Sequence, residues 1–302
     1  MADLSLFQGG GGGSTVGDVR PLYTNDNNGL FLIGTEEWLR TGVIETNTAN
    51  YPDARTSALP KGTQFGAGYS FTAQDTLPYG ITTDGLHVYM VGDNSDTIYR
   101  YNLDGSYTGF SFSVSAQNSA PRGLVFDGVN LCMLGNTGIY KYTLDGIYTG
   151  VFYSVTSFNN NPVGLGWTGT EFLISNFSDG TVYRVSSAGA YLGVLFSDSN
   201  RLQLKGLTQN QATGNIYTVA NDNSVFEYTS AGVATGFSFS TSSFETQPSA
   251  LSYLSTTPDS IYVVGFSGDD ATPFLIEPKP FVGIGTQRFQ ANTGLPFYVR
   301  IK

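Results

Sequence analysis

Short runs in which apolar and polar residues alternate fill the middle of the chain, and each run ends at a turn signal. The first four runs read YGITT, LHVYMVG, TIYRYNL and YTGFSFS, and the next four read RGLVF, NLCMLG, GIYKYTL and YTGVFYS. Alternation with a period of two residues is typical of a β-strand that has one buried face. The pattern therefore predicts units of four strands, which we call A to D in chain order.

The connections within each unit carry hairpin chemistry. TDGL, FDGV and TGTE join A to B, whereas LDGS, LDGI, SAGA and SAGV join C to D. Glycine, asparagine and aspartate accept the positive φ angles that tight hairpins require. We therefore expect the four strands of a unit to form one antiparallel sheet.

The unit itself repeats along the chain. A small residue opens each A run, and it recurs at Gly80, Gly123, Gly164, Gly206 and Ala250. A period of about 42 residues built from short strands is typical of the blades of a β-propeller. A small residue suits the position at which the innermost strands crowd around a central axis. Five copies predict five blades.

The fifth unit lacks its D run. SALSYL, SIYVVG and PFLIE supply A, B and C, but Pro278 and Pro280 follow where D is expected. An earlier segment, FGAGYSF at residues 65–71, is similar to the D runs YTGFSFS and YTGVFYS. Because an unpaired outer strand is an aggregation hazard, we expect this segment to pair with the strand at residues 274–277 and to close the ring.

These patterns predict an all-β protein. Residues 63–278 are expected to form a five-bladed β-propeller of four-stranded blades closed by an N-terminal strand. Residues 1–62 and 279–302 are expected to form a small N/C-terminal attachment module. A chain of 302 residues that is 40% hydrophobic can bury a sizeable core. Its many Tyr, Phe and Gly residues favour strands and turns over helices.

Such a ring has two faces. The A–B and C–D turns leave one face, which the sequence predicts to consist of tight turns only. The longer B–C and D–A loops leave the other, and they are rich in Asn, Asp and Ser. These side chains suit a hydroxylated ligand such as a glycan, or a hard cation, but they also dominate turns for conformational reasons alone. The candidate ligand-binding residues are Asp93, Asp96, Asn136, Asn176, Asp179, Asp222, Asn223, Asp269 and Asp270.

The two flanks do not fit the repeat. The N-terminal flank contains the Gly9 to Gly13 run and WLRTGVIETNTANYPDA, and the C-terminal flank ends in TGLPFYVRIK. Neither flank can bury much apolar surface alone. We therefore expect them to form a small domain together, or an attachment element that orders against neighbouring subunits.

Charge and targeting signals narrow the classes of partner. The formal net charge of −10 makes nucleic acid and anionic membranes poor partners. The single cysteine, Cys132, lies in the apolar run LCML and is predicted to be a buried thiol. The N-terminus has neither a basic start nor a long apolar stretch. We expect synthesis in the cytosol without an N-terminal export signal, and no membrane insertion.

No constellation of residues indicates catalysis. The one histidine, His87, occupies an alternating strand position, where a surface or half-buried role is more common than that of a general base. The sequence contains no Gly-x-Ser-x-Gly elbow, no phosphate-cradling loop and no His or Cys pair with metal spacing. We therefore expect no enzymatic activity, no cofactor and no metal.

Two resemblances add to this interpretation. GITTDGLHVYMVGDNSDTIYRYNLDG, with its echo GLGWTGTEFLISNFSDGTVYRVSSAG, resembles the repeat of NHL-type propellers, and this resemblance implies the fold only. The sequence WLRTGVIETNTANYPDA and the terminal TGLPFYVRIK resemble segments of tailed-bacteriophage structural proteins, in which a shared end module carries variable β domains. The second resemblance implies that the flanks assemble and the propeller is displayed, with Trp38, Arg40, Tyr298 and Arg300 as candidate assembly residues.

The resulting functional hypothesis is a virion component that is made in the host cytoplasm. It would contact other virion proteins through its termini, form a homo-oligomer and expose its loop face to a host-surface glycan, as a tail-associated fibre or adsorption protein does. A head-decorating protein is the alternative within the same class. An NHL-like or lactonase-like propeller enzyme or scaffold is the alternative from another class.

Overall fold

The structure is a computed structural model, and it describes residues 60–64, 68–201, 203–254, 260–266, 268 and 270–277, together with the backbone of four strands in the flanks. The chain divides into two compact units, Gly62–Ile276 and the combination of Met1–Lys61 with Glu277–Lys302. Each unit is described separately below.

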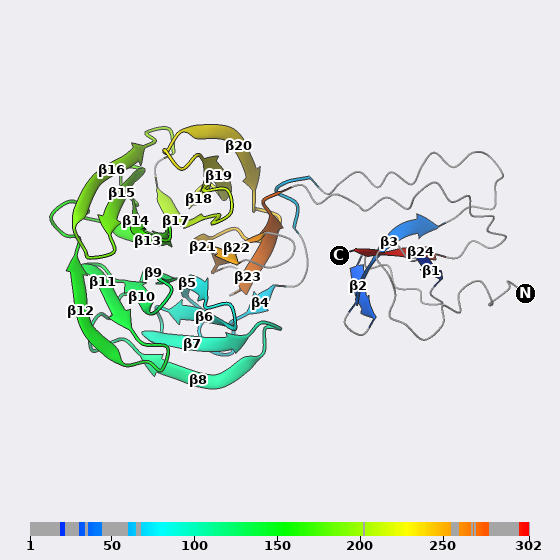
Figure 1. The fold of residues 1–302 in the computed structure, drawn as a ribbon, viewed down its shortest axis with the longest axis horizontal. Helices are drawn as coiled ribbons and strands as arrows, with labels where there is room; N and C mark the ends of the chain where they lie inside the picture. Colours follow the sequence, from blue (N-terminus) through cyan, green and yellow to red (C-terminus); the bar gives the residue numbers. More distant parts are fainter. Residues whose placement is uncertain are drawn as a thin grey trace, which may run out of the picture. The chain divides into compact units, whose positions relative to one another are not determined.

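The larger unit consists of five antiparallel sheets of four strands each, which stand around one centre (Figure 1). Blades one and two contain β5 (Pro78–Thr83), β6 (His87–Gly92), β7 (Thr97–Asn102), β8 (Tyr107–Ser113), β9 (Gly123–Phe126), β10 (Leu131–Leu134), β11 (Gly138–Tyr142) and β12 (Tyr148–Ser154). Blades three and four contain β13 (Pro162–Trp167), β14 (Glu171–Asn176), β15 (Thr181–Ser186), β16 (Tyr191–Ser197), β17 (Leu204–Gln209), β18 (Ile216–Ala220), β19 (Ser224–Tyr228) and β20 (Ala234–Ser240). Blade five contains β21 (Pro248–Leu254), β22 (Ser260–Gly265), β23 (Asp270–Leu275) and β4 (Tyr69–Ser70). The predicted five-bladed propeller is confirmed.

The fifth blade takes its outermost strand from the N-terminal side of the ring, as predicted. β4 pairs antiparallel with β23, with Tyr69 opposite Ala271, and a bridge joins Gln64 to Phe274. Tyr69 therefore lies in the same sheet as Leu275. Residues 65–67 lie outside the described residues.

The C–D turn of this blade is assembled from two distant segments. Gly62 donates its backbone N–H to the carbonyl of Leu275 at 2.8 Å, and Leu275 donates to the carbonyl of Thr63 at 2.9 Å. In the first blade Gly105 and Asn102 make the same two bonds within one continuous hairpin. Gly62 and Gly105 also share the left-handed conformation, with φ of 84° and 88°. The propeller is thus closed by a turn at which the chain both enters and leaves.

Neighbouring blades are joined by a recurring tyrosine contact. Tyr153, on the outer strand β12, donates its hydroxyl to the carbonyl of Ser187 in the next C–D turn at 3.0 Å. Tyr69, on the closing strand, donates to the carbonyl of Leu103 in the first blade at 3.1 Å. The seam between the last and first blades therefore uses the same contact as an internal boundary.

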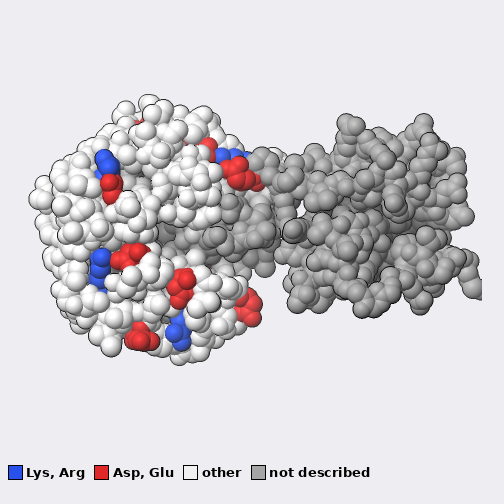
Figure 2. Space-filling model, in the orientation of Figure 1, with Lys and Arg blue, Asp and Glu red and all other residues white. Residues whose placement is uncertain are grey.

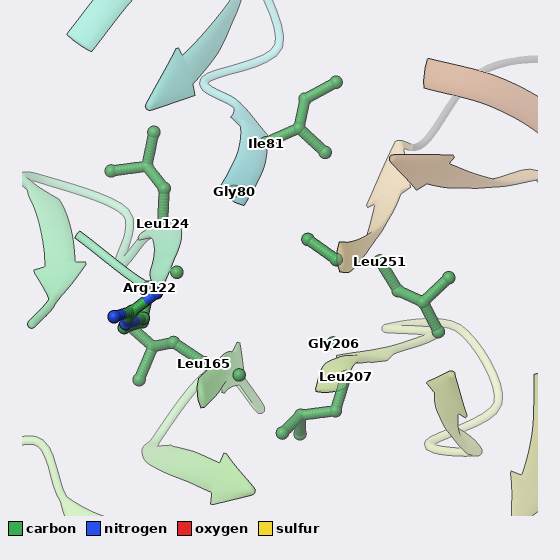
Figure 3. Close-up of a pocket in the computed structure, with 11 residues that line it drawn as sticks. Gly80, Ile81, Arg122, Leu124, Leu165, Gly206, Leu207 and Leu251 are labelled. Atoms are coloured by element: carbon green, nitrogen blue, oxygen red, sulfur yellow. The ribbon is translucent and has the colours of Figure 1, made fainter. Parts of the chain in front are cut away.

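The inner strands meet closely at the axis. Figure 3 shows Gly80 and Gly206 near the axis with Leu124, Leu165, Leu207 and Leu251 around it. A Cβ on Gly206 would overlap the Cα of Ala250 and the backbone nitrogen of Leu251. The axis leaves no cavity for a water molecule. This crowding explains why each inner strand opens with glycine or alanine.

The flanks form a sheet of their own. β1 (Val19–Pro21), β24 (Pro296–Ile301), β3 (Glu36–Val43) and β2 (Leu30–Ile33) lie in that order and pair antiparallel. The C-terminal strand β24 lies between two N-terminal strands. Segments from both ends of the chain therefore make one structural element.

Candidate functional site

The antiparallel order of the blades defines two faces of the ring. We call the end with the A–B and C–D turns the turn face, and the end with the B–C and D–A loops the loop face. The split turn at Gly62 and Leu275 is a C–D turn, so the chain enters and leaves the propeller on the turn face. The loop face is the opposite end of the ring.

The D–A loops share a built-in backbone turn. In the loop that precedes the first blade, Gln74 and Asp75 both donate their backbone N–H to the carbonyl of Phe71. The same pair of bonds recurs at Val114, Val155 and Thr241. Repeated geometry of this kind gives the loop face a defined framework rather than a set of unrelated loops.

A buried polar side chain closes each of these turns. Asp75 accepts hydrogen bonds from the backbone N–H and hydroxyl of Ser95 in the B–C loop, the first at 2.9 Å. Asn118 donates to Oδ1 of Asn136 at 2.7 Å. The residues that hold this position are Asp75, Asn118, Asn159 and Glu245. The sequence analysis missed them, although all lie three residues before a proline of the repeat.

Four of the predicted ligand-binding residues are engaged in turn structure. Asn176 is buried and donates to Oδ1 of Asn160 at 3.1 Å. Asp179 and Asp222 accept backbone N–H groups two residues ahead, at 2.9 and 3.0 Å. Asn136 accepts the Asn118 amide described above. Their carboxyl and amide groups thus shape the loops.

The other predicted residues are placed differently. Asp96 and Asn223 open the C strands in the left-handed conformation, with φ of 48° and 63°. Their side-chain Oδ1 atoms are buried and accept no hydrogen bond within the described part of the chain. Asp270 begins β23 opposite Ser70, and Asp269 lies outside the described residues. The eight residues that the structure describes therefore have several different local roles.

A mixed aromatic and charged group forms next to the axis on the loop face. The guanidinium of Arg122 lies over the ring of Tyr79, 4.9 Å from its centroid, and Tyr79 packs edge-on against Phe266 at 4.8 Å. Arg122 also lies 3.9 Å from Oδ2 of Asp93. We call Tyr79, Arg122, Asp93 and Phe266 the mouth cluster. It offers an aromatic surface, a cation and a carboxylate within one small region.

Burial raises the pKa of the Asp93 carboxyl. Arg122 opposes this effect, whereas the negative charges of Asp96 and Asp75 add to it. On the far side of the axis, burial lowers the pKa of the Lys205 ammonium, and the charge of Glu245 opposes that shift. Burial thus disfavours the charged form of an acidic and of a basic group at the mouth of the ring.

One position of the sequence repeat supplies two residues of the mouth cluster, and it also supplies Lys205. In every blade, one residue lies between the Pro or Leu that begins the repeat motif and the Gly or Ala that follows. In blades one to five this residue is Tyr79, Arg122, Val163, Lys205 and Ser249, respectively. In four blades the register of pairing between strands A and B shifts at this position. Its side chain varies in chemistry from blade to blade, whereas the residues before and after it stay apolar and small, respectively.

Charged groups are few over the surface of the propeller. Figure 2 shows one face, on which Lys, Arg, Asp and Glu side chains are dispersed, often with opposite charges adjacent, on a largely uncharged surface. Recognition on such a surface depends on hydrogen bonding and aromatic contact more than on net charge.

Cys132 and His87, which the sequence analysis considered for chemical roles, lie on the turn-face side. Cys132 is buried, as predicted, and its thiol donates to Oδ2 of Asp127 at 3.3 Å. Burial raises the pKa of this thiol well above its usual value, so it is a poor nucleophile. His87 is half-buried on β6, with Nδ1 3.6 Å from Oδ2 of Asp84.

The ion pair between Lys141 and Asp127 allows a test of stability. Nζ and Oδ2 are 2.9 Å apart, and both side chains are buried. Burial opposes ionisation of Asp127, but the backbone N–H of Asn130 and the Lys141 ammonium lower its pKa overall. The carboxylate therefore stabilises the fold above about pH 4, and this contribution is lost as the pH falls through the lowered pKa.

Replacing Asp127 with Asn is expected to lower the free energy of unfolding by about 3 kcal/mol at pH 7, because it leaves a buried ammonium without its counter-ion. The difference from wild type should narrow below about pH 4. Urea denaturation at a series of pH values measures both effects. Asp145→Asn, at an exposed turn position, should change stability by less than about 0.5 kcal/mol. Equal effects of the two substitutions would contradict the assignment.

The described residues offer neither a candidate metal centre nor a candidate membrane-spanning helix. They contain no group of three or more His, Cys, Asp or Glu side chains placed to hold a metal ion. No helix in this part of the chain has the length and apolar character of a membrane span.

Comparison with known proteins gives the fold. No protein-family model matches the chain, and no curated protein is similar to it in sequence. Among solved structures, Myxococcus xanthus glutaminyl cyclase is 13% identical, with a TM-score of 0.56 over 72% of this chain and 99% of that one. A nidogen/laminin complex is 15% identical (TM-score 0.47, 63% and 72% covered), and Staphylococcus aureus virginiamycin B lyase is 18% identical (0.43, 68% and 72%).

At 13% identity, the likeness to glutaminyl cyclase shows a shared fold alone. With its five blades of four strands, this protein belongs to the class of five-bladed β-propellers. The NHL-like repeat predicted from the sequence is in keeping with that class.

Proposed function

We propose that the protein is a structural component of a tailed-phage virion that displays its propeller, as a tail-associated fibre or host-adsorption protein with a glycan ligand. The observation that carries the proposal is the split C–D turn of blade five. Because the chain enters and leaves the ring on the turn face, attachment through the termini leaves the loop face available. A domain mounted in this way is suited to display.

The chemistry of the loop face supports a hydroxylated ligand. Tyr79 and Phe266 supply aromatic surface on which the apolar face of a sugar ring can pack. Arg122 and Asp93 supply a donor and an acceptor beside it. The proposed site is therefore the mouth cluster.

The flanks support the attachment role. β3 and β24 come from opposite ends of the chain, and their register sets Trp38 opposite Arg300 and Arg40 opposite Tyr298. The four predicted assembly residues thus occupy two adjacent strands of one sheet. We propose that this sheet contacts other virion proteins, that the protein forms a homo-oligomer, and that it acts without catalysis or a cofactor.

Glycan binding is tested with Arg122→Ala on the full chain. A glycan array followed by calorimetry on the best ligand should give at least about a tenfold loss of affinity, as expected when a central interface residue is truncated. Arg100→Ala is the matched control, because Arg100 also lies over an aromatic ring, 4.3 Å from the centroid of Phe110, but on the turn-face side. Equal affinity in wild type and Arg122→Ala would refute the mouth cluster as the site.

The location in the particle needs a separate measurement. A reconstruction of the virion that carries the protein at the tail would support the adsorption role. Density on the capsid would instead support head decoration, in which the propeller contributes surface and the flanks hold the shell. Absence from purified particles would refute both.

The structural likeness to glutaminyl cyclase supplies one enzymatic candidate. Formation of pyroglutamate from a peptide with N-terminal glutamine is the corresponding assay. Turnover that disappears in Arg122→Ala or Asp93→Asn would replace the display proposal with an enzymatic one.

A further inference from the structure

We propose that a cleft between the third and fourth blades, on the turn face, binds a neutral saccharide. The cleft has a volume of about 500 Å³, which is within the range of small-molecule sites. Its walls come from the A–B turn of blade three, the outer strand β16, the start of β18 and the C–D turn of blade four. It is separate from the mouth cluster, which lies on the loop face.

The cleft has a specific origin in the fourth A–B hairpin. The sequence predicts tight turns of two to four residues on this face. In blade one the backbone N–H of Asp84 donates to the carbonyl of His87, whereas in blade four the N–H of Asn210 donates to the carbonyl of Asn215. The fourth hairpin is therefore two residues longer than the first. Gln211 at its tip donates to the carbonyl of Trp167 in blade three at 2.7 Å. This bond joins the hairpin to blade three at the residue before Thr168, which lines the cleft.

The outer strand of blade three is also unusual. In blade one Phe110 covers the guanidinium of Arg100, at 4.3 Å. The corresponding residue of β16 in the sequence repeat is Val194, and the pairing of β15 with β16 shifts at two places rather than one. Arg184, which corresponds to Arg100, has 37% of its side chain exposed. The aromatic ring that lies over the guanidinium in blade one is thus replaced by a valine in blade three.

The charges in the cleft cancel each other. Nε and Nη2 of Arg184 each donate to a carboxylate oxygen of Glu171, both at 2.8 Å. Such a bidentate pair is planar and rigid, and it keeps free lone pairs and N–H groups along its edge. Because the pair is neutral overall, it gives no preference to an anionic or a cationic ligand.

The remaining lining combines hydroxyl and aliphatic groups. Thr170 and Ser230 place hydroxyls at exposed positions of the rim. The side-chain amide of Gln209 donates to the carbonyl of Gly214, and this bond leaves the side-chain oxygen to accept a hydrogen bond. Val194 and Leu195 supply apolar surface between them. A neutral sugar has hydroxyl edges and a C–H face, so it matches both components, whereas a purely apolar ligand would leave the polar groups without partners.

The probe is a panel of neutral di- and trisaccharides, applied to the full chain on an array and then by calorimetry. Ala231→Phe fills the cleft from the C–D turn of blade four and should weaken binding at least tenfold. Ala188→Phe places the same side chain at the corresponding exposed turn position of blade three, outside the lining, and should leave affinity within twofold. Thermal melts of both variants show whether they remain folded.

Two further variants decide the assignment. Thr170→Val takes the residue that blade two has at this position, Val129, and replaces only a hydroxyl with a methyl group, so a threefold or greater loss is expected. Arg122→Ala must leave binding of this saccharide unchanged, which separates the cleft from the mouth cluster. The proposal is overturned if no neutral saccharide binds, if only charged glycans bind, or if Ala231→Phe and Ala188→Phe bind equally well.

Discussion

Replacing Gly206 with alanine is expected to destabilise the propeller by about 3 kcal/mol or more, at the upper end of the cost of overpacking a core. The added Cβ would overlap the Cα of Ala250 and the nitrogen of Leu251, which are backbone atoms of the neighbouring inner strand. Backbone cannot turn aside as the end of a flexible side chain can. The inner strands of blades four and five would have to separate, and the axis leaves no cavity to receive the displaced atoms.

Unfolding of the propeller is measured in a Trp38→Phe background. This background leaves Trp167, in β13, as the only tryptophan, so urea denaturation followed by its fluorescence reports on the larger unit alone. Ala250→Gly is the control, because it removes a methyl group at the same position of the next blade and should cost about 1 kcal/mol. A Gly206→Ala midpoint equal to that of wild type would show that the inner strands are not in contact.

The blades could be predicted because each one repeats the same pattern of strands and turns. Period-two alternation, Gly-containing hairpins and a small residue at the start of each inner strand are visible in a single copy, and five copies reinforce them. The closing strand was predictable for the same reason, since residues 65–71 keep the pattern of an outer strand even though their partner β23 lies far away in the sequence. What the sequence did not reveal was the split turn made by Gly62 and Leu275.

The candidate sites were less predictable, because the amino-acid composition of a loop does not show which way each side chain points. Asn176 and Asp222 come from equally polar loops, yet the first is buried against Asn160 and the second is exposed. Polar residues that cap turns and polar residues that contact ligands have the same composition. The position occupied by Tyr79 and Arg122 is better marked, because it is defined by the repeat and not by the loop.

The cleft lay beyond sequence reasoning for a different reason. It depends on how far the hairpin at Asn210 extends toward blade three, and on the register of β15 with β16. Both are relations between strands of neighbouring units, and neither alters the alternation within a strand. A repeat indicates what its copies share, so a site formed by their differences becomes visible only when the copies are packed together.

Truncating Phe71 to alanine is expected to cost about 4 kcal/mol, as for other fully buried phenylalanines. Phe71 follows the closing strand, is 0% exposed and packs edge-on against Tyr101 of the first blade at 5.2 Å between ring centroids. It belongs to a cluster that includes Tyr69, Ile81 and Tyr262, which come from the last and the first blade. The cavity would therefore open at the one seam where the ring is joined by non-consecutive chain.

Tyr69→Phe separates the contribution of the seam from that of the core. It removes only the hydrogen bond to the carbonyl of Leu103, so a loss of about 1 kcal/mol is expected. Tyr153→Phe removes the equivalent bond at an internal boundary and should cost a similar amount. If the closing strand holds the ring together, hydrogen exchange in Phe71→Ala should increase first in β23 and β5, before the strands of blade three. Uniform exchange across all five blades would show instead that the ring opens as one unit and that closure at this seam has no special role.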